Sequence, residues 1–223
     1  NIRHSITKMS ILHFVNHKLY KKRLIQLGEN PKNIYNFGSL GSENFKKIKK
    51  IEKKEIESKF KFKFKEKNLI ITFHPETLDK NDSALQIKQI IKALDKLKNT
   101  KLIFTSSNTD TDGDIINKII IQYVNLNKNK AIFIKSMGQL YYFSTLKYID
   151  GVIGNSSSGI YEAPIFKIGT VNIGKRQEGR LQAESIINCE AIFKSISKSI
   201  RTLYSSKFQE KLKETKDIYY KKN

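Results

Sequence analysis

The stretch Asp150-Gly-Val-Ile-Gly-Asn-Ser-Ser-Ser-Gly159 contains the most informative pattern in the chain. A short apolar run ends at Ile153, a loop of small polar residues follows, and residues 157–166 have helical spacing. Strand, polar loop and helix in this order are typical of a βαβ unit, whose strand is buried in a parallel sheet. Such a loop exposes backbone N–H groups at the start of a helix, where a phosphate group is favoured.

The same alternation extends in both directions along the chain. Further strands are predicted at 68–73, 101–105, 131–134 and 170–173, and helices at 83–98, 113–127, 137–148 and 190–220, with two in the last range. Five short apolar runs alternating with helices predict an α/β fold: a Rossmann-like parallel sheet with helices on both faces. Ligands bind at the carboxyl ends of the strands in such a sheet, so the polar loops after the strands form the candidate site.

The chain before residue 68 has a different pattern. Residues 7–28 have apolar positions at helical spacing and stop at Gly28, which is typical of a helix C-cap. A short strand is predicted at 34–37. Residues 43–67 are dense in lysine and glutamate, and they predict a short helix with an exposed connector, which makes this segment the best domain boundary in the chain.

The composition excludes several classes of protein. The single cysteine, Cys189, excludes a disulfide framework and a multi-cysteine metal site, and no apolar run is long enough to span a membrane. The net charge of +21 invites a nucleic-acid interpretation. However, only five of the 42 basic residues are arginines and the lysines are spread along the chain, so a general lysine bias is favoured and no nucleic-acid partner is expected. The positive field still attracts an anionic nucleotide.

Two of the candidate loops carry anion-binding side chains. Ser156, Ser157 and Ser158 add hydroxyl donors to the first loop, although an ordinary serine N-cap is the alternative. Glu162, one helical turn further, is expected to accept from a sugar hydroxyl, because a carboxylate repels phosphate. Arg176 and Arg180 follow the last predicted strand, and their guanidinium groups suit a diphosphate unless this is simply a solvated loop.

The histidines support two further hypotheses. His74 follows a predicted buried strand, where it can donate to a leaving phosphate or move a proton; a structural histidine with satisfied hydrogen bonds is the alternative. His13 and His17 are four residues apart, a spacing compatible with a metal site. Acidic ligands are absent nearby, so no metal is expected.

Four motifs point in the same direction when they are taken together. They are Arg3-His-Ser-Ile-Thr-Lys8, Thr72-Phe-His-Pro-Glu-Thr77, Ile153-Gly-Asn-Ser-Ser-Ser-Gly-Ile-Tyr-Glu-Ala-Pro164 and Val171-Asn-Ile-Gly-Lys-Arg-Gln-Glu-Gly-Arg180. In this order they resemble the hydrolysing UDP-N-acetylglucosamine 2-epimerases, particularly those of sialic-acid and legionaminic-acid pathways in bacteria. The resemblance covers essentially the whole chain.

The resemblance implies a GT-B-like fold of two Rossmann-like domains. Residues 1–42 would be the C-terminal part of the first domain, 43–67 a connector, 68–205 the UDP-binding domain and 206–223 a C-terminal helix. The remainder of the first domain, with the acidic catalytic residues of the family, would lie outside this chain.

The resemblance also implies roles for ten residues. The catalytic residues would be His74 and Arg3, and the UDP-binding residues would be Asn108, Met137, Tyr142, Ser156, Ser157, Glu162, Arg176 and Arg180. In the implied reaction a base removes the C2 proton of a UDP-N-acetylhexosamine as UDP leaves, and water then adds to the 2-acetamidoglucal with inversion at C2. No metal or cofactor is implied.

The implied protein is cytoplasmic, acts on a UDP-sugar, forms a homodimer or larger homo-oligomer at full length, and has no membrane partner. UDP-N-acetylglucosamine and a 2,4-diacetamido UDP-sugar both stay open as substrates. A GT-B-type glycosyltransferase, a non-catalytic UDP-sugar-binding fragment and a nucleic-acid-binding protein are the alternative functions.

Overall fold

The computed structural model describes residues 2–39, 50–76, 83–108 and 112–220. The chain divides into two compact units, of which the larger covers 49–216 and the smaller covers 1–48 together with 217–223.

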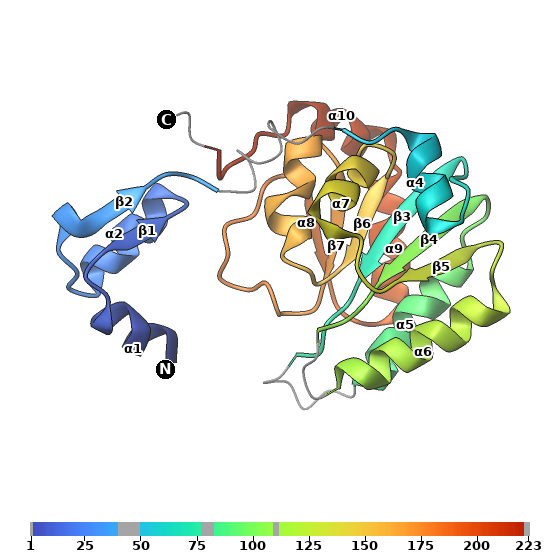
Figure 1. The fold of residues 1–223 in the computed structure, drawn as a ribbon, viewed down its shortest axis with the longest axis horizontal. Coiled ribbons are helices and arrows are strands. Elements are labelled where there is room, and N and C mark those ends of the chain that lie inside the picture. The colour runs from blue at the N-terminus through green and yellow to red at the C-terminus, as the bar shows by residue number, and fades with distance from the viewer. Residues whose placement is uncertain (1, 40–49, 77–82, 109–111, 221–223) are drawn as a thin grey trace. The chain divides into compact units, whose positions relative to one another are not determined.

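The larger unit is built on a six-stranded sheet (Figure 1). The strands, in their order across the sheet, are β5 (Ala131–Ile134), β4 (Thr100–Thr105), β3 (Lys67–Thr72), β6 (Gly151–Gly154), β7 (Gly169–Ile173) and β8 (Ile186–Cys189). All neighbours are parallel. Numbered along the chain, this is the 3-2-1-4-5-6 order of the doubly wound Rossmann fold. The order reverses between β3 and β6, and a ligand crevice is expected at the carboxyl ends of these two strands.

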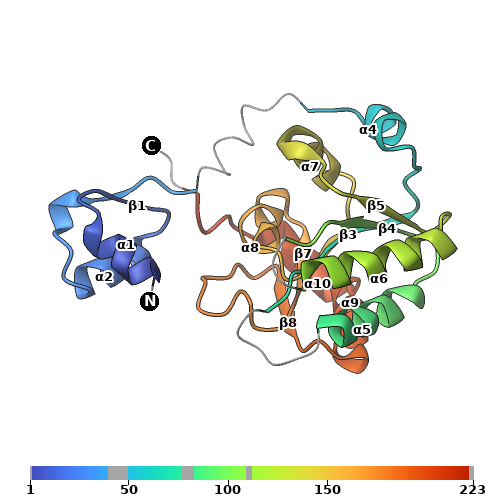
Figure 2. The same ribbon diagram turned by 60° about the horizontal axis from the view of Figure 1, so that its bottom comes forward.

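Helices cover both faces of this sheet (Figure 2). One face carries α5 (Ser83–Asp95), α6 (Gly113–Leu126) and α9 (Phe193–Leu203), and the other carries α4 (Lys53–Phe60), α7 (Gly138–Leu146) and α8 (Ser158–Tyr161). The short 3₁₀ helix η2 (Ala163–Phe166) follows α8, and α10 (Ser206–Glu214) follows α9. Because both faces are covered, Leu69, Ile70 and Ile71 of β3 are all 0% exposed, which explains the continuous apolar run in the sequence. Among the described residues, no helix has both the length and the apolar character needed to cross a membrane.

The structure confirms the α/β class and the five predicted strands, and it adds a sixth. β8 lies at the edge of the sheet, where its residues are half-buried or exposed, so its sequence carries no continuous apolar run. The segment predicted as an exposed connector also differs in the part that is described. Ile51, Ile56, Phe62 and Phe64 are buried, so residues 50–66 contribute to the core of the larger unit.

The smaller unit contains α1 (Ile2–Met9), β1 (His13–Val15), α2 (Lys18–Gln26), the 3₁₀ helix η1 (Pro31–Asn33) and β2 (Ile34–Asn36). The prediction of one helix over 7–28 is therefore wrong. The aromatic and β-branched residues of β1 pair in parallel with β2, and this pairing outweighs the helical spacing of the surrounding sequence. The predicted role of Gly28 as helix terminator is confirmed, because it follows α2 with φ +87°.

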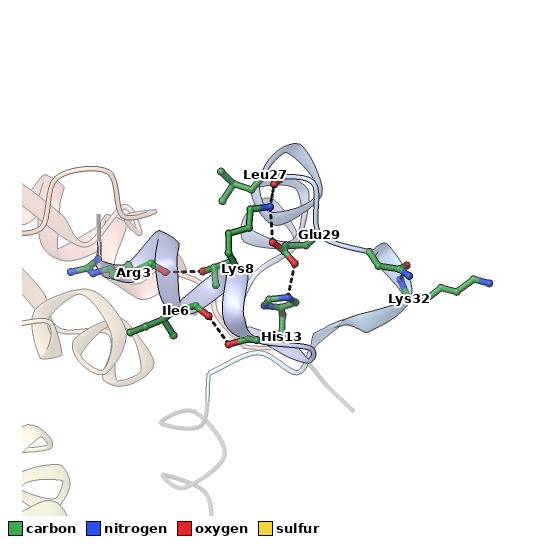
Figure 3. A network of polar contacts seen from close by, with 10 residues as sticks. Arg3, Ile6, Lys8, His13, Leu27, Glu29 and Lys32 are labelled. Atoms are coloured by element: carbon green, nitrogen blue, oxygen red, sulfur yellow. Dashed lines mark hydrogen bonds and ion pairs between the residues drawn. The ribbon is translucent and has the colours of Figure 1, made fainter.

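The histidines of the smaller unit have separate structural roles. Glu29 accepts from Lys8 Nζ at 2.9 Å and from His13 Nε2 at 3.1 Å, and Figure 3 shows these side chains together. The hydrogen bond from Lys8 is the main cause that lowers the pKa of the Glu29 carboxyl. His17 instead caps α2, because its Nδ1 accepts the Leu19 N–H at 3.1 Å. One imidazole thus hydrogen-bonds a carboxylate and the other caps a helix.

The C-terminal residues fold with the smaller unit. The predicted helix over 206–223 ends at Glu214, and Tyr219 is 1% exposed in the smaller unit. The rings of Tyr219 and Tyr20 stack with centroids 6.4 Å apart, and their hydroxyl oxygens are 3.2 Å apart.

Candidate functional site

A cavity of about 480 Å³ opens at the carboxyl ends of β3, β4, β5 and β6. We call it the switch-point cavity, because the strand order reverses there. Its volume lies in the range of small-molecule sites. It brings together six of the predicted site residues, namely His74, Met137, Tyr142, Ser156, Ser157 and Glu162.

Asn155 joins the ends of the two central strands beneath this cavity. Its side chain is fully buried, its Oδ1 accepts the His74 N–H at 2.7 Å, and its Nδ2 donates to the His74 carbonyl at 2.9 Å. The Asn155 carbonyl in turn accepts from Gln177 Nε2 at 2.6 Å and from Arg176 Nη1 at 3.1 Å. One asparagine therefore ties together the loops that follow β3, β6 and β7.

Gly154 ends β6 in a conformation that a side chain would not allow. Its φ is +127°, and a Cβ would lie 2.0 Å from the Thr72 carbonyl oxygen. This close approach lets the next backbone N–H, from Asn155, donate to the same Thr72 carbonyl at 3.1 Å. The glycine is thus required where β6 meets β3 at the switch point.

The ring of His74 is fixed in one tautomer. His74 is buried at the wall of the cavity, and its Nδ1 accepts the backbone N–H of Asn108 at 3.0 Å. A ring nitrogen that accepts a hydrogen bond carries no proton, so the neutral imidazole holds its proton on Nε2. That tautomer is the donor form needed for a contact with a phosphate oxygen. Asn108, a predicted site residue, does not line the cavity, and its backbone orients this ring.

Hydroxyl and carboxyl groups gather on the wall formed by α7 and α8. The Tyr142 hydroxyl hydrogen-bonds with Ser158 Oγ, and burial raises the pKa of the tyrosine. Burial also raises the pKa of the Glu162 carboxyl, although the Ser158 hydroxyl partly opposes this shift. A half-buried carboxyl group among hydroxyls suits a neutral sugar hydroxyl better than it suits a phosphate.

The serine loop is only partly used by the protein itself. Ser157 is the N-cap residue of α8 but makes no side-chain cap hydrogen bond, so the N-cap alternative does not account for its hydroxyl. Ser156 Oγ accepts the Ser158 N–H at 3.3 Å. Because α8 is a single turn, its macrodipole contributes little, and the serine hydroxyls are the main donors that this loop offers.

The two arginines lie outside the switch-point cavity. Arg176 is bound at both ends, since its N–H donates to Glu76 Oε1 at 3.2 Å and its Nη1 donates to the Asn155 carbonyl. The Arg180 guanidinium lies over the Tyr161 ring, 5.4 Å from the centroid, and its Nη1 is buried with no hydrogen-bond partner among the described residues. Arg176 therefore supports the loop, while Arg180 keeps a donor available for an anion.

The remaining predicted residues are placed as follows. Arg3 is exposed on α1 of the smaller unit, and in Figure 3 its guanidinium points away from the group of Lys8, His13 and Glu29. Thr77 and Asp110, which end two of the predicted loops, lie outside the described residues.

The sequence did not reveal Asn155, Gln177 or the structural use of Glu76. The partner of Asn155 is 81 residues away along the chain, so no local pattern reports this pair. A weak signal was present nonetheless, because Gly154-Asn155 stands where a strand ends, and glycine there indicates close backbone approach.

Known proteins have similar sequences, and solved structures have the same fold. A family model described as UDP-N-acetylglucosamine 2-epimerase matches residues 1–223. The GDP/UDP-N,N'-diacetylbacillosamine 2-epimerase (hydrolyzing) of Campylobacter jejuni is 43% identical over 210 residues, which are 94% of this chain and 54% of that protein. The polysialic acid biosynthesis protein P7 of Escherichia coli is 39% identical over 223 residues, which are all of this chain and 56% of that protein.

A solved structure with the same fold is the S. aureus MnaA–UDP complex. It has a TM-score of 0.73 and 14% sequence identity, with 97% of this chain and 58% of that chain covered. The chain thus spans about half the length of the curated relatives it matches, since the two shares are 54% and 56%.

Proposed function

This chain belongs to the UDP-N-acetylglucosamine 2-epimerase family, and on that premise we propose that it is the UDP-binding part of a hydrolysing UDP-sugar 2-epimerase. The switch-point cavity carries this proposal. It combines a histidine held as an Nε2–H donor, a loop of serine hydroxyls and a half-buried carboxyl group in one space of about 480 Å³.

The proposed reaction converts a UDP-N-acetylhexosamine and water into UDP and the free sugar with inverted C2. A base removes the C2 proton, the C1–O bond breaks, and its electron pair leaves with the UDP phosphate. Water then adds to the 2-acetamidoglucal, with oxygen bonding to C1 and a proton returning to C2 on the opposite face.

In this reaction the residues of the cavity stabilise the leaving group. Nε2–H of His74 and the hydroxyls of Ser156 and Ser157 donate to phosphate oxygens as negative charge develops there, which is preorganised electrostatic stabilisation. Glu162 accepts from a ribose hydroxyl. The region of Met137 and Tyr142 contacts the uracil ring.

The arginines and Asn108 have secondary places in the proposal. Arg180 lies outside the switch-point cavity in this structure, and it donates to the diphosphate when UDP is bound, because its Nη1 has no hydrogen-bond partner among the described residues. Arg176 and Asn108 act through the loops that they hold. Arg3 approaches the sugar in the longer protein.

The substrate is proposed at the level of a UDP-N-acetylhexosamine. Because the relative with 43% identity is named for N,N'-diacetylbacillosamine, a 2,4-diacetamido UDP-sugar is the first substrate to assay, with UDP-N-acetylglucosamine beside it. A bacterial sialic-acid or legionaminic-acid pathway, a cytoplasmic location and a homo-oligomeric longer protein belong to the same proposal.

Titration with UDP in a calorimeter tests the binding function. The double variant Ser156→Ala/Ser157→Ala should bind UDP about tenfold more weakly, since hydrogen bonds to a charged group are lost. Ser195→Ala on α9 is the matched control and should stay within about twofold. No saturable heat at millimolar UDP from a folded sample would overturn the proposal.

A further inference from the structure

A second cavity lies at the opposite end of the sheet and has a volume of about 790 Å³. Its walls come from α4, the segment 61–65, the amino ends of β4 and β5, and the end of α6. Lys101 of β4 lines this cavity, whereas Thr105 of the same strand lines the switch-point cavity. Four residues of strand, about 13 Å, separate these two positions, so the second cavity is a distinct site.

Lysine side chains dominate the wall of this second cavity. They are Lys54, Lys61, Lys63, Lys65, Lys101 and Lys128, and we call the space they line the lysine cavity. Glu57 is the one carboxylate among the described residues that line it. Both oxygens of Glu57 have partners within the protein, because Oε1 accepts the Phe64 N–H at 2.9 Å and Oε2 pairs with Lys63 Nζ at 3.0 Å. The wall therefore keeps a strong net positive charge.

Lys101 differs from the other lysines because it is buried, with 4% of its surface exposed. Its ammonium donates to the Asn129 carbonyl at 3.1 Å, and this is its one hydrogen bond to the described residues. An ammonium group has three donors, and a buried cation without a counter-ion is costly. Burial, together with repulsion from Lys65, lowers the pKa of Lys101. A bound anion would supply the negative charge that no described residue places against this ammonium.

We propose that the lysine cavity binds a small molecule that carries two or more phosphate groups, with Lys101 as the buried anchor. Several ammonium groups around one concave space match several negative charges, and lysine binds phosphate as a point charge without needing a fixed planar geometry. The volume fits a small molecule, while an extended nucleic acid would need a long basic stripe. The general lysine bias of the chain does not explain why an ammonium group is buried here.

Lysine labelling locates the site directly. The chain is acetylated with and without inorganic tripolyphosphate, and modification at each lysine is read by mass spectrometry. We expect at least threefold protection of Lys61, Lys65 and Lys128, and none at Lys88, an exposed lysine on α5 outside both cavities. Equal protection of Lys88, or protection confined to Lys135 of the switch-point cavity, would overturn the proposal.

Calorimetry with tripolyphosphate tests the anchor. Lys101→Met removes the ammonium at similar volume and should weaken binding at least tenfold, while Lys88→Met makes the same change in net charge and should stay within about twofold. Equal losses in both variants would mean unspecific attraction and refute the site. If circular dichroism shows that Lys101→Met is unfolded, the exposed positions replace it: unchanged affinity in Lys65→Met and in Lys128→Met would then refute it.

The source of the phosphate groups is decided with two further probes. Tighter binding of ADP than of tripolyphosphate, with the same protected lysines, supports the site and identifies a nucleotide ligand. A single-stranded oligonucleotide that binds more tightly than either and extends protection to Lys88 would instead identify a nucleic-acid surface and overturn the proposal.

Discussion

Replacing Asn155 by alanine would test how the site is held together. The change removes the hydrogen bonds of 2.7 Å and 2.9 Å to the backbone of His74, both of them in the interior. A typical hydrogen bond contributes about 0.5–1.5 kcal/mol net, and leaving a buried group unsatisfied costs about 1–3 kcal/mol. The N–H and the carbonyl of His74 would each lose a partner and bear part of the cost of an unsatisfied buried group. We therefore expect the free energy of unfolding to fall by about 2–4 kcal/mol.

Urea denaturation and thermal melting measure this loss. One kcal/mol shifts Tm by about 2–4 °C in a domain of this size, so the melting temperature should fall by about 4–16 °C. Asn125→Ala, an exposed change on α6, is the matched control and should stay within about 0.5 kcal/mol. Because Asn155 also positions His74, UDP affinity should fall in the variant even where it is fully folded. A variant as stable as the parent, or one that binds UDP equally well while His74→Ala does not, would refute the reasoning.

Four further predictions rest on the same geometry. Glu162→Gln should raise thermal stability at neutral pH. The raised pKa of Glu162 means that the folded state binds more protons than the unfolded state, so the stability of the parent falls as pH rises through that pKa. Melting curves between about pH 4 and pH 8 should show that the gain in stability of the variant grows with pH, and a gain that is the same at every pH would contradict this origin. The same variant should lose more affinity for UDP than for pyrophosphate. Gly154→Ala should destabilise the larger unit by more than about 2 kcal/mol, whereas Gly179→Ala, also at positive φ but with open space around it, should cost only about 1 kcal/mol in denaturation experiments. The 223-residue chain alone should bind UDP but should not exchange the C2 proton of UDP-N-acetylglucosamine in deuterated water. The reason is that Glu162 is the one carboxylate among the described residues that line the switch-point cavity. Deuterium incorporation detected by NMR would show that a catalytic base is present.

The interior strands could be predicted from the sequence because burial on both faces produces continuous apolar runs. β3 and β5 are examples, and their predicted limits are within one residue of the observed ones. β8 gave no such signal because an edge strand is covered less completely. The prediction of one helix over 7–28 failed for a different reason. The apolar residues there do have helical spacing, but the pairing of β1 with β2, which joins residues distant in the sequence, determined the structure.

The sequence identified side chains that line the switch-point cavity, but it did not identify the residues whose hydrogen bonds join the loops around it. Ser156, Ser157 and Glu162 stand in one loop and its helix, so their proximity is local. Asn155 and Gln177 act through hydrogen bonds between loops that are distant in sequence, and no spacing rule reports such bonds. Arg176 was predicted as a phosphate ligand from its residue type, its place after a strand and the family resemblance, and none of these reports the hydrogen bonds that it makes to a backbone carbonyl and to Glu76.

The reversal of strand order between β3 and β6 has a consequence for protein synthesis. His74 and Asn155 are 81 residues apart, so at about 5–20 residues per second the ribosome needs roughly 4–16 seconds to make the partner of β3 after β3 itself. During that interval β4 and β5 can pair on one side of β3, while the other edge exposes unpaired N–H and C=O groups along its apolar residues Leu69, Ile70 and Ile71. The strand at the centre of the ligand site therefore keeps one open edge until β6 has been made, and during that time this edge is where a holdase chaperone would protect the nascent chain.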